Sequence, residues 1–314
     1  MKVVVTGAAG FIGSSLVERL LDDGYDVIGI DSLTDYYSID LKLGNLRAIT
    51  SSKFKFLNID INSANLDELL PDVDYIFHLA GQPGVRSSWG TEFETYTSRN
   101  ILATQRLLEA SHKVGTIKRF VYASSSSIYG DSERYPTFEA DAPHPLSPYG
   151  VSKLAAEHLC SLYANNFGVP TISLRYFTVY GPRQRPDMAF TRFLEAAVRG
   201  KEVTIYGDGE QVRDFTYVGD IVRANILAAT VPDVPPGTIL NVSGGSHVSV
   251  NQVLGLVAEI SGAGLNVTYG AGVAGDVRRT GGSTDKIRSV LGWTPTVDLS
   301  AGLTRQLEWV NRPR

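Results

Sequence analysis

The sequence predicts an α/β fold, in which a doubly wound parallel sheet is followed by a smaller C-terminal α/β domain. Two observations support this prediction. Short buried strand patterns alternate with helical stretches, and a glycine-rich turn joins the first strand to the first helix. Such alternation is typical of parallel sheets, and their ligands bind at the carboxyl ends of the strands. We expect residues 1–175 to form the first domain, with some later segments returning to it, and residues 176–314 to form most of the second.

The first strand, turn, helix and second strand follow one another closely. Val3–Val5 form a buried strand pattern, residues 14–21 have apolar positions at helical spacing, and residues 27–30 form a second strand that ends at Asp31. The turn between them contains Gly7, Gly10 and Gly13. This is the context of a dinucleotide fingerprint, in which the glycines let the pyrophosphate approach the helix N-terminus. The sequence therefore predicts a Rossmann-type domain rather than glycines in an ordinary tight turn.

The expected cofactor is NAD. Asp31 can accept hydrogen bonds from the adenosine ribose hydroxyls, and it is followed by Ser32 rather than by an arginine that would bind a 2′-phosphate. Further strands are predicted over residues 54–57, 75–79, 119–123 and 171–175. Because cofactors bind at strand ends, the remaining cofactor-binding candidates near these ends and in the turn are Phe11, Ile12, Asp60, Ile61, Leu79, Ala80, Gly81, Gln82 and Tyr176.

A candidate acid/base pair follows the fifth predicted strand. Tyr149 and Lys153 are four residues apart, so on a helix their side chains share one face. A nearby ammonium group favours the phenolate and lowers the pKa of a tyrosine, which could then exchange a proton with a hydroxyl. The spacing alone also occurs on ordinary surface helices. The four serines of residues 124–127 stand at the end of a strand shortly before this pair, which favours a hydroxyl donor there over a plain polar loop.

The composition indicates a soluble globular protein, with 43% hydrophobic and 20% charged residues. A net charge of −4 provides no basic surface for nucleic acid or anionic membrane. The single Cys160 excludes an internal disulfide and a cysteine metal site, and its apolar helical context predicts a buried thiol. No metal site is expected. No apolar run reaches the about 18 residues of a membrane span. Since no signal peptide precedes the first strand, we expect a cytoplasmic protein.

The chain resembles the extended short-chain dehydrogenase/reductase family, specifically its nucleotide-sugar epimerases and dehydratases. The resemblance extends from the first strand to beyond residue 210, and a Leu291-Gly-Trp293 segment continues it. The matching motifs are Gly7-x-x-Gly10-x-x-Gly13, His78-Leu-Ala-Gly81, Tyr122-Ala-Ser-Ser-Ser-Ser-Ile-Tyr-Gly130, Tyr149-x-x-x-Lys153, Arg175-Tyr-Phe-Thr-Val-Tyr-Gly-Pro182 and Arg213-Asp-Phe-Thr-Tyr-Val218.

The resemblance implies roles for individual residues. Tyr149 would be the base, Lys153 would bind the nicotinamide ribose and lower the tyrosine pKa, and Ser125 would hydrogen-bond the reacting hydroxyl. Asn100 matches an asparagine near the cofactor. The C-terminal domain would hold a nucleoside diphosphate, for which arginine is suited by its fixed fork of donors. The candidates there are Arg213 and Arg278 for the diphosphate and Asp276 for the uridine ribose.

The residues near the tyrosine favour one reaction within the family. Its members first move a hydride from sugar C4 to NAD, which gives a 4-keto sugar. Dehydratases then use an Asp-Glu pair where this chain has Ser126 and Ser127, and the glucuronate decarboxylases have a glutamate at the second of these positions. Without those groups, the simplest outcome is return of the hydride to the other face of the ketone. The resemblance thus implies 4-epimerisation of a UDP-sugar.

The group at sugar C6 is the next question. Epimerases of neutral hexoses carry asparagine where this chain has Thr178. The segments around Thr178, Arg185-Pro-Asp-Met188 and Gly84-Val-Arg86 are similar to those of UDP-glucuronate 4-epimerases. Arg185 and Arg192 are the carboxylate-binding candidates, with Arg86 as a weaker one. A neutral UDP-glucose or UDP-N-acetylglucosamine substrate stays open, as does a non-catalytic NAD-sensing protein. Family members usually dimerise through two long helices, here expected around residues 92–114 and 149–167.

Overall fold

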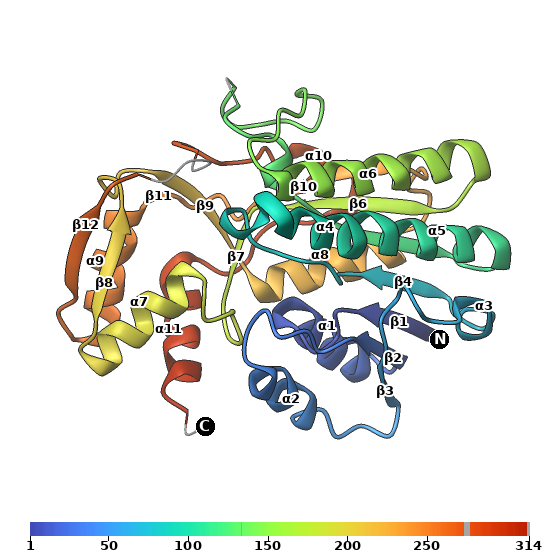
Figure 1. The fold of residues 1–314 in the computed structure, drawn as a ribbon, viewed down its shortest axis with the longest axis horizontal. Helices are drawn as coiled ribbons and strands as arrows, with labels where there is room; N and C mark the ends of the chain where they lie inside the picture. The colour runs from blue at the N-terminus through green and yellow to red at the C-terminus, as the bar shows by residue number, and fades with distance from the viewer. Residues whose placement is uncertain (133, 273–276, 313–314) are drawn as a thin grey trace.

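The computed structural model describes residues 1–132, 134–272 and 277–312. A large sheet with helices on both faces occupies one side of the molecule, and smaller sheets with helices α7, α9 and α11 form the other side (Figure 1). This agrees with the doubly wound α/β fold and the smaller C-terminal α/β part that the sequence predicts. No helix in the described part of the chain is both long and apolar enough to cross a lipid bilayer.

Within the described residues, seven strands form one parallel sheet, in the order β10-β6-β5-β4-β1-β2-β3. Strand β10, from the C-terminal half, pairs with β6 at its edge, so a late segment does return to the first sheet. The strand order reverses beside β1, where a ligand crevice is expected in such folds. The bounds are β1 Lys2–Thr6, β2 Asp26–Asp31, β3 Phe54–Asn58, β4 Tyr75–His78, β5 Arg119–Ser125, β6 Thr171–Tyr176 and β10 Thr238–Val242.

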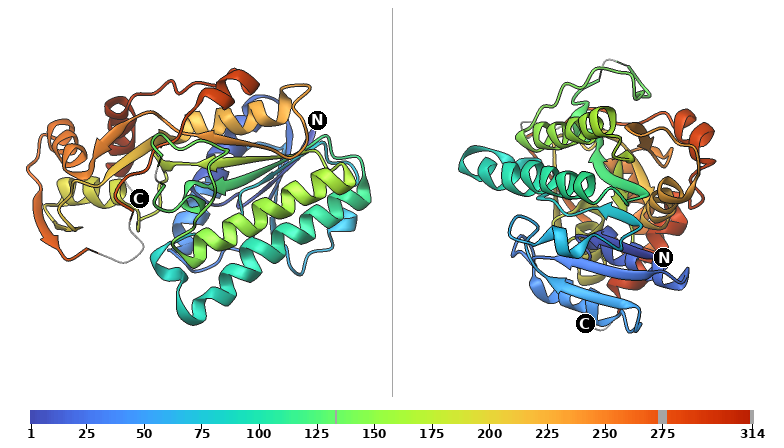
Figure 2. Two further views of the ribbon diagram at one scale, coloured as in Figure 1. Left: turned by 90° about the horizontal axis from the view of Figure 1, so that it is seen from above. Right: turned by 90° about the vertical axis from the view of Figure 1, so that its right-hand side faces the viewer.

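The sheet is buried on both faces, which explains why its strands are continuous apolar runs rather than alternating ones. One apolar cluster packs beneath α1 (Phe11–Asp22), α8 (Val218–Thr230) and α10 (Asp285–Leu291). The other packs beneath α3 (Leu66–Leu69), α5 (Ala103–Val114) and α6 (Pro148–Phe167). Helices α5 and α6 run side by side on that face, as the left view of Figure 2 shows. Cys160 of α6 is a buried free thiol.

The helix expected over residues 92–114 is not one regular α-helix. The chain forms α4 (Phe93–Tyr96), then a π-helix over Thr97–Leu102, and only then α5. A π-helix turn inserts an extra residue and re-aims side chains, and such turns are frequent at functional sites. Here the π-helix contains Arg99 and Asn100, both of which reach the cavity described below. Apolar spacing cannot reveal this insertion, because it changes the angle of the turn and not the residue types.

The C-terminal part contains two small sheets and a separate apolar cluster. One sheet has the order β11-β9-β7 and the other pairs β12 with β8. The buried Trp293 connects the C-terminal segment to α8, one of the helices that cover the large sheet. Its indole nitrogen donates to the carbonyl of Asp220 in α8 at 2.9 Å. The bounds are β7 Thr178–Tyr180, α7 Ala189–Arg199, β8 Glu202–Tyr206, β9 Val212–Tyr217, β11 His247–Ser249, α9 Val250–Ser261, β12 Asn266–Gly270 and α11 Leu299–Val310.

Candidate active site

Two glycines at the turn between β1 and α1 leave no room for a side chain. Gly7 has φ +72°, and a Cβ added to it would lie 2.9 Å from the amide nitrogen of Ala80. A Cβ on Gly13 would lie 2.0 Å from the carbonyl oxygen of Gly7. Gly10 precedes the first turn of α1 and offers no capping side chain. The amide groups of that turn are therefore open to an anion, as a pyrophosphate site requires.

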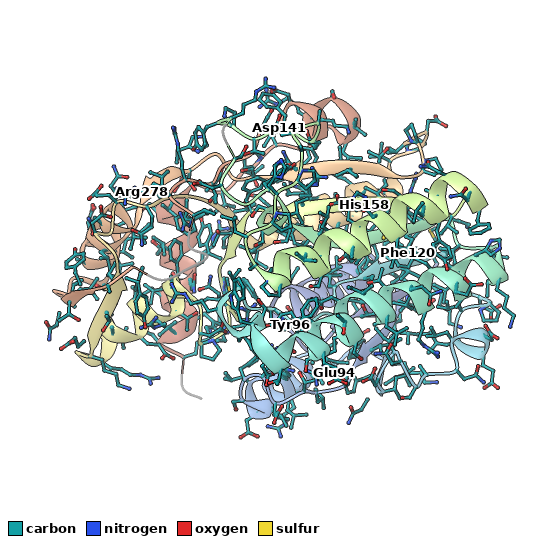
Figure 3. All side chains as sticks on the ribbon, turned by 45° about the horizontal axis from the view of Figure 1, so that its top comes forward. Glu94, Tyr96, Phe120, Asp141, His158 and Arg278 are labelled. Atoms are coloured by element: carbon teal, nitrogen blue, oxygen red, sulfur yellow. The ribbon has the colours of Figure 1, made fainter. Side chains whose placement is uncertain are left out.

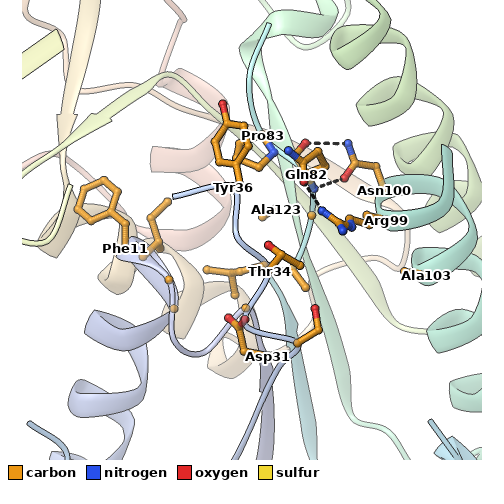
Figure 4. Close-up of a pocket in the computed structure, with 18 of the residues that line it drawn as sticks. Phe11, Asp31, Thr34, Tyr36, Gln82, Pro83, Arg99, Asn100, Ala103 and Ala123 are labelled. Carbon is orange, nitrogen blue, oxygen red and sulfur yellow. Dashed lines mark hydrogen bonds between the residues drawn. The ribbon is translucent and has the colours of Figure 1, made fainter. Parts of the chain in front are cut away.

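A cavity of about 250 Å³ opens from this turn along the carboxyl ends of the strands (Figure 4). Every residue that the sequence proposes for cofactor binding lines it, from both sides of the strand-order reversal. They are Gly7, Gly10, Phe11, Ile12, Gly13, Asp31, Ser32, Asp60, Ile61, Leu79, Ala80, Gly81, Gln82, Asn100, Tyr149, Lys153 and Tyr176. Residues expected at the strand ends, in the glycine turn and on the Tyr149 helix thus lie around one cavity.

Asp31 stands at one end of the cavity with its carboxylate already oriented. One oxygen accepts from the amide of Leu33 at 2.8 Å and the other from the amide of Ala9 at 3.2 Å. Lys42 lies nearby, with its ammonium donating to the carbonyl of Thr34 at 2.7 Å. Burial lowers the pKa of Lys42, and the charge of Asp31 opposes that shift. The fixed carboxylate is suited to accepting ribose hydroxyl groups.

Asn100 of the π-helix fixes the segment that follows β4. Its amide oxygen accepts from the backbone nitrogen of Gln82 at 2.6 Å, and its amide nitrogen donates to the carbonyl of Gln82 at 3.1 Å and to the hydroxyl of Ser152 at 2.9 Å. Arg99 donates to the side-chain oxygen of Gln82 at 2.7 Å (Figure 4). Asn100 therefore joins the cofactor wall to α6, the helix of the Tyr/Lys pair.

Tyr149 and Lys153 line the other end of the cavity, and Ser124 lines it beside them. Tyr149 and Lys153 lie in the first turns of α6, and Ser125 at the end of β5 is near enough to Tyr149 to lower the pKa of its hydroxyl, although Ser125 itself is not part of the cavity wall. Ser125 also accepts from the backbone nitrogen of Ser127 at 3.1 Å. The ammonium of Lys153 lies 4.4 Å from the centre of the Tyr122 ring. A half-buried phenol and a half-buried hydroxyl thus lie near the buried ammonium of Lys153.

Burial shifts the pKa values of two titratable groups of this site. It raises the pKa of Tyr149 above its ordinary value, while the side chain of Ser125 and the charge of Arg185 oppose the shift. Burial lowers the pKa of Lys153 itself to about 8. The charge that aids the phenolate here comes from Arg185, a residue with no place in the Tyr-x-x-x-Lys motif.

Arg185 is the substrate-binding candidate that reaches the cavity. It lines the wall with Tyr149 and Tyr36, and its guanidinium lies 5.8 Å from the centre of the Tyr36 ring. Two of its donors bind Asp187, with Nε to Oδ1 at 3.0 Å and Nη2 to Oδ2 at 2.9 Å. This occupies one edge of the guanidinium fork. The other edge keeps donors with which a second carboxylate can pair.

The other substrate candidates among the described residues lie outside the cavity wall. Ser126 and Ser127 form the turn after β5, and Thr178 begins β7. Arg192 is exposed on α7. Asp276 is outside the described residues. The guanidinium of Arg86 lies 4.5 Å from the centre of the Tyr206 ring. Arg213 donates to the carbonyl of Val212, and Arg278 is ion-paired with Asp208 at 2.8 Å. Figure 3 shows Arg278 on the C-terminal side of the molecule, away from Tyr96 beside the cavity.

Several cavity residues escape the sequence interpretation. Tyr36, Lys42 and Arg99 line the wall, yet they belong to a loop, a short helix and the π-helix, and no motif marks them. Ser124 also lines the cavity, one residue before the predicted Ser125. His78 has a structural role. Its ring nitrogens hydrogen-bond threonine hydroxyls at 2.8 and 2.9 Å, and burial and Lys153 lower its pKa to about 3.

A glycine turn, an oriented acidic side chain and a buried Tyr/Lys/Ser set at one edge of a parallel sheet define a dinucleotide-dependent enzyme of the short-chain dehydrogenase type. The model of the NAD dependent epimerase/dehydratase family matches residues 3–243. The chain belongs to this family. The residues around the cavity fit NAD, because a Cβ on Gly7 or Gly13 would clash within the turn and Asp31 presents acceptors to a ribose.

Comparison with known proteins places the chain among nucleotide-sugar epimerases. It is 44% identical to the uncharacterized UDP-glucose epimerase YtcB of Bacillus subtilis (strain 168), with 99% of this chain and 98% of that protein covered. It is 37% identical to the UDP-glucuronate 4-epimerase of Thermodesulfobacterium geofontis (strain OPF15), with 98% and 95% covered. Among solved structures, the UDP-glucuronic acid 4-epimerase of Bacillus cereus, in complex with UDP-glucuronic acid and NAD, superimposes with a TM-score of 0.95, 42% identity and 99% coverage of both chains.

Proposed function

We propose that the chain catalyses the NAD-dependent 4-epimerisation of UDP-glucuronate to UDP-galacturonate through a transient 4-keto sugar. The observation that carries this proposal is Arg185, which lines the same cavity as Tyr149 and keeps one edge of its guanidinium available. A carboxylate at sugar C6 is the substrate group that such an arginine would bind. The similarity to a Bacillus cereus enzyme solved with UDP-glucuronic acid and NAD supports the same assignment.

The proton transfers are assigned to the buried Tyr/Ser/Lys set. NAD, when bound, accepts the hydride from sugar C4 and returns it. Tyr149 would take the proton of the C4 hydroxyl as the hydride leaves and give it back afterwards. Ser125, whose side chain lowers the pKa of Tyr149, would hold that hydroxyl in line. Lys153 would donate to the nicotinamide ribose and supply positive charge to the site.

The carboxylate subsite is assigned to Arg185 with Thr178. Arg192 is exposed on α7, and Arg86 lies against Tyr206, so neither has the position of Arg185 in the cavity wall. A charge-assisted pair with a buried arginine contributes roughly 1.5–3 kcal/mol. Because the 4-keto form of a glucuronate is a β-keto acid, clamping its carboxylate away from alignment with the ketone would also suppress loss of CO₂. Ser126 and Ser127 offer no acid to promote elimination or decarboxylation.

The remaining parts of the substrate are assigned to the C-terminal part of the chain. Arg213 and Arg278 would bind the diphosphate, and Asp276 the uridine ribose. Arg278 is held by Asp208 when no ligand is present, and both side chains are exposed. Diphosphate binding would therefore exchange one ion pair for another. On this proposal residues 1–175 with the returning β10 bind NAD, and most of residues 176–314 bind the UDP-sugar.

A homodimer is the proposed assembly. Helices α5 and α6 lie side by side on one face of the sheet. Exposed apolar side chains occur on Leu102, at the end of the π-helix before α5, and on Val151, Leu162 and Phe167 of α6. Exposed apolar side chains on neighbouring helices are typical of a protein interface, and a second copy of the same two helices would cover them. A cytoplasmic location is proposed with it.

The alternative substrate is a neutral UDP-hexose. The relative YtcB is named a UDP-glucose epimerase, and it shares 44% of its residues with this chain. Incubating the purified protein with UDP-glucuronate, UDP-glucose and UDP-N-acetylglucosamine, and resolving the products by NMR, separates the two. We expect UDP-galacturonate to form fastest and no pentose to accumulate. A stoichiometric UDP-pentose, or faster turnover of a neutral sugar, would contradict the proposal. Unchanged activity in Tyr149→Phe would instead indicate a different mechanism.

A further inference from the structure

A buried ion pair joins α6 to β6 one helical turn beyond Lys153. Arg175 donates to Glu157 through Nη2 to Oε1 at 2.7 Å and through Nε to Oε2 at 3.0 Å. Their side chains are 3% and 1% exposed. Removing two charges from water costs about as much as their attraction returns, so a buried pair of this kind is a weak source of net stability. Its location next to the proton relay indicates another role.

The same carboxylate also holds the end of β5. Ser124 donates to Oε2 of Glu157 at 2.6 Å. Ser124 and Arg175 are register partners on adjacent strands, so one carboxylate fixes both. The next residue along the chain is Ser125, whose side chain lowers the pKa of Tyr149. Tyr149, Lys153 and Glu157 are spaced four residues apart on α6 and lie on one helix face.

The far end of the serine segment is tied to the same arginine. Arg175 donates through Nη1 to the hydroxyl of Tyr129, and that hydroxyl donates to Oδ1 of Asn241 in β10 at 2.8 Å. Tyr129 directly follows the turn that contains Ser126 and Ser127. Residues 124–129 are thus held at both ends by one buried pair, with Ser125 between the two attachment points.

We propose that Ser124, Glu157 and Arg175 are positioning residues for the proton relay, which hold Ser125 within hydrogen-bonding distance of Tyr149. A displacement of about 1 Å in a reacting geometry can cost on the order of 100-fold in rate. A hydroxyl at the end of a strand would gain such freedom if its neighbour lost its anchor. The inference rests on the proposed C4 oxidation, because it assigns Tyr149 as the base.

The groups that face Tyr149 define the expected effect on pH dependence. They are Ser125 from β5, Tyr96 from α4, Tyr36 from the segment after β2, and Arg185 from the segment after β7. The side chain of Ser125 lowers the pKa of Tyr149, as does the charge of Arg185. Loosening Ser125 alone removes one of these influences and leaves Arg185 in place. The pKa of Tyr149 then rises, and the acidic limb of the rate profile moves to higher pH.

The test is Ser124→Ala in the NAD-saturated protein, assayed with whichever UDP-sugar the wild type converts fastest. We expect kcat to fall roughly tenfold with little change in KM, and the acidic limb to move to higher pH. Ser124→Thr keeps the hydroxyl and should restore most of both. Ser111→Ala is the matched control, because Ser111 and Ser124 are both 3% exposed and the Ser111 hydroxyl binds only a backbone carbonyl of α5. That variant should retain wild-type kinetics.

A substrate-free measurement separates this inference from the proposed function. Ultraviolet absorbance titration of the NAD-saturated protein, as a difference from the same background with Tyr149→Phe, reports the ionisation of Tyr149. Ser124→Ala should titrate at higher pH than wild type or Ser111→Ala. Coincident titrations of Ser124→Ala and wild type, an equal shift in Ser111→Ala, or a loss confined to KM would overturn the proposal. Should Ser124→Ala fail to fold, Tyr129→Phe releases the other end of the segment and must give the same direction of shift.

Discussion

The NAD side and the UDP-sugar side of this molecule are prepared for their ligands to different degrees. On the NAD side, every residue expected from the sequence lines one cavity, and its oriented groups are fixed by backbone geometry and short hydrogen bonds. On the sugar side, Arg185 reaches the cavity, while Arg278 is paired with Asp208 and Arg192 is exposed. The comparison teaches that the expected cofactor residues converge on one cavity at the strand ends, whereas among the described residues proposed for sugar binding Arg185 is the one that lies in its wall.

The largest expected effect is on the rigid side. Gly13→Ala places a Cβ 2.0 Å from the carbonyl oxygen of Gly7, which the backbone of the turn cannot accommodate without moving. Overpacking of this kind should weaken NAD binding by roughly 100-fold or more. Isothermal titration with NAD measures it.

Gly255→Ala is the control for that variant, because a Cβ there meets nothing within 4 Å on helix α9. It should bind NAD as the wild type does. An NAD affinity in Gly13→Ala equal to wild type would show that the cradle is more plastic than its geometry indicates.

The second effect concerns the arginine that connects the two sides. Arg185→Ala should reduce kcat/KM for UDP-glucuronate by about 10- to 150-fold, which corresponds to the loss of roughly 1.5–3 kcal/mol from a charge-assisted pair. Turnover of UDP-glucose, which has no carboxylate, should fall far less. Arg192→Ala, on the exposed face of α7, should leave the preference unchanged. An equal loss of kcat/KM for both sugars in Arg185→Ala would contradict the assignment of Arg185 to the carboxylate subsite.

The smallest effect is a pH dependence of stability in the NAD-free protein. Burial lowers the pKa of Lys153 from 10.5 to about 8, so between these values the unfolded state binds more protons than the folded state. Stability contributed by this group therefore rises as pH increases through that window. Relative to Lys153→Met, which has no titrating group there, wild type should gain about 1–2 kcal/mol between pH 8 and 10. Denaturant unfolding at each pH checks this, and a flat or falling difference would contradict the assigned burial.

The sequence predicts the NAD side well because its signals are local. One βαβ unit contains all of them: the buried valines of β1, the turn with the glycines that cannot carry a Cβ, and Asp31 at the end of β2. Tyr36, Lys42 and Arg99 could not be predicted, because tertiary packing brings them to the cavity from segments without a motif. The π-helix could not be predicted either, because it changes the angle of the turn and not the residue types. The pairs of Arg185 with Asp187 and of Arg278 with Asp208 depend on side-chain placement, which no spacing rule gives.

The most direct test of the account is a crystal structure of the protein with NAD and UDP-glucuronate. It should place the sugar carboxylate within about 3 Å of the guanidinium of Arg185, with C4 facing Tyr149 and Ser125. A sugar carboxylate bound by Arg192 or Arg86, with Arg185 engaged only by Asp187, would contradict the central claim that Arg185 joins the cofactor cavity to the substrate.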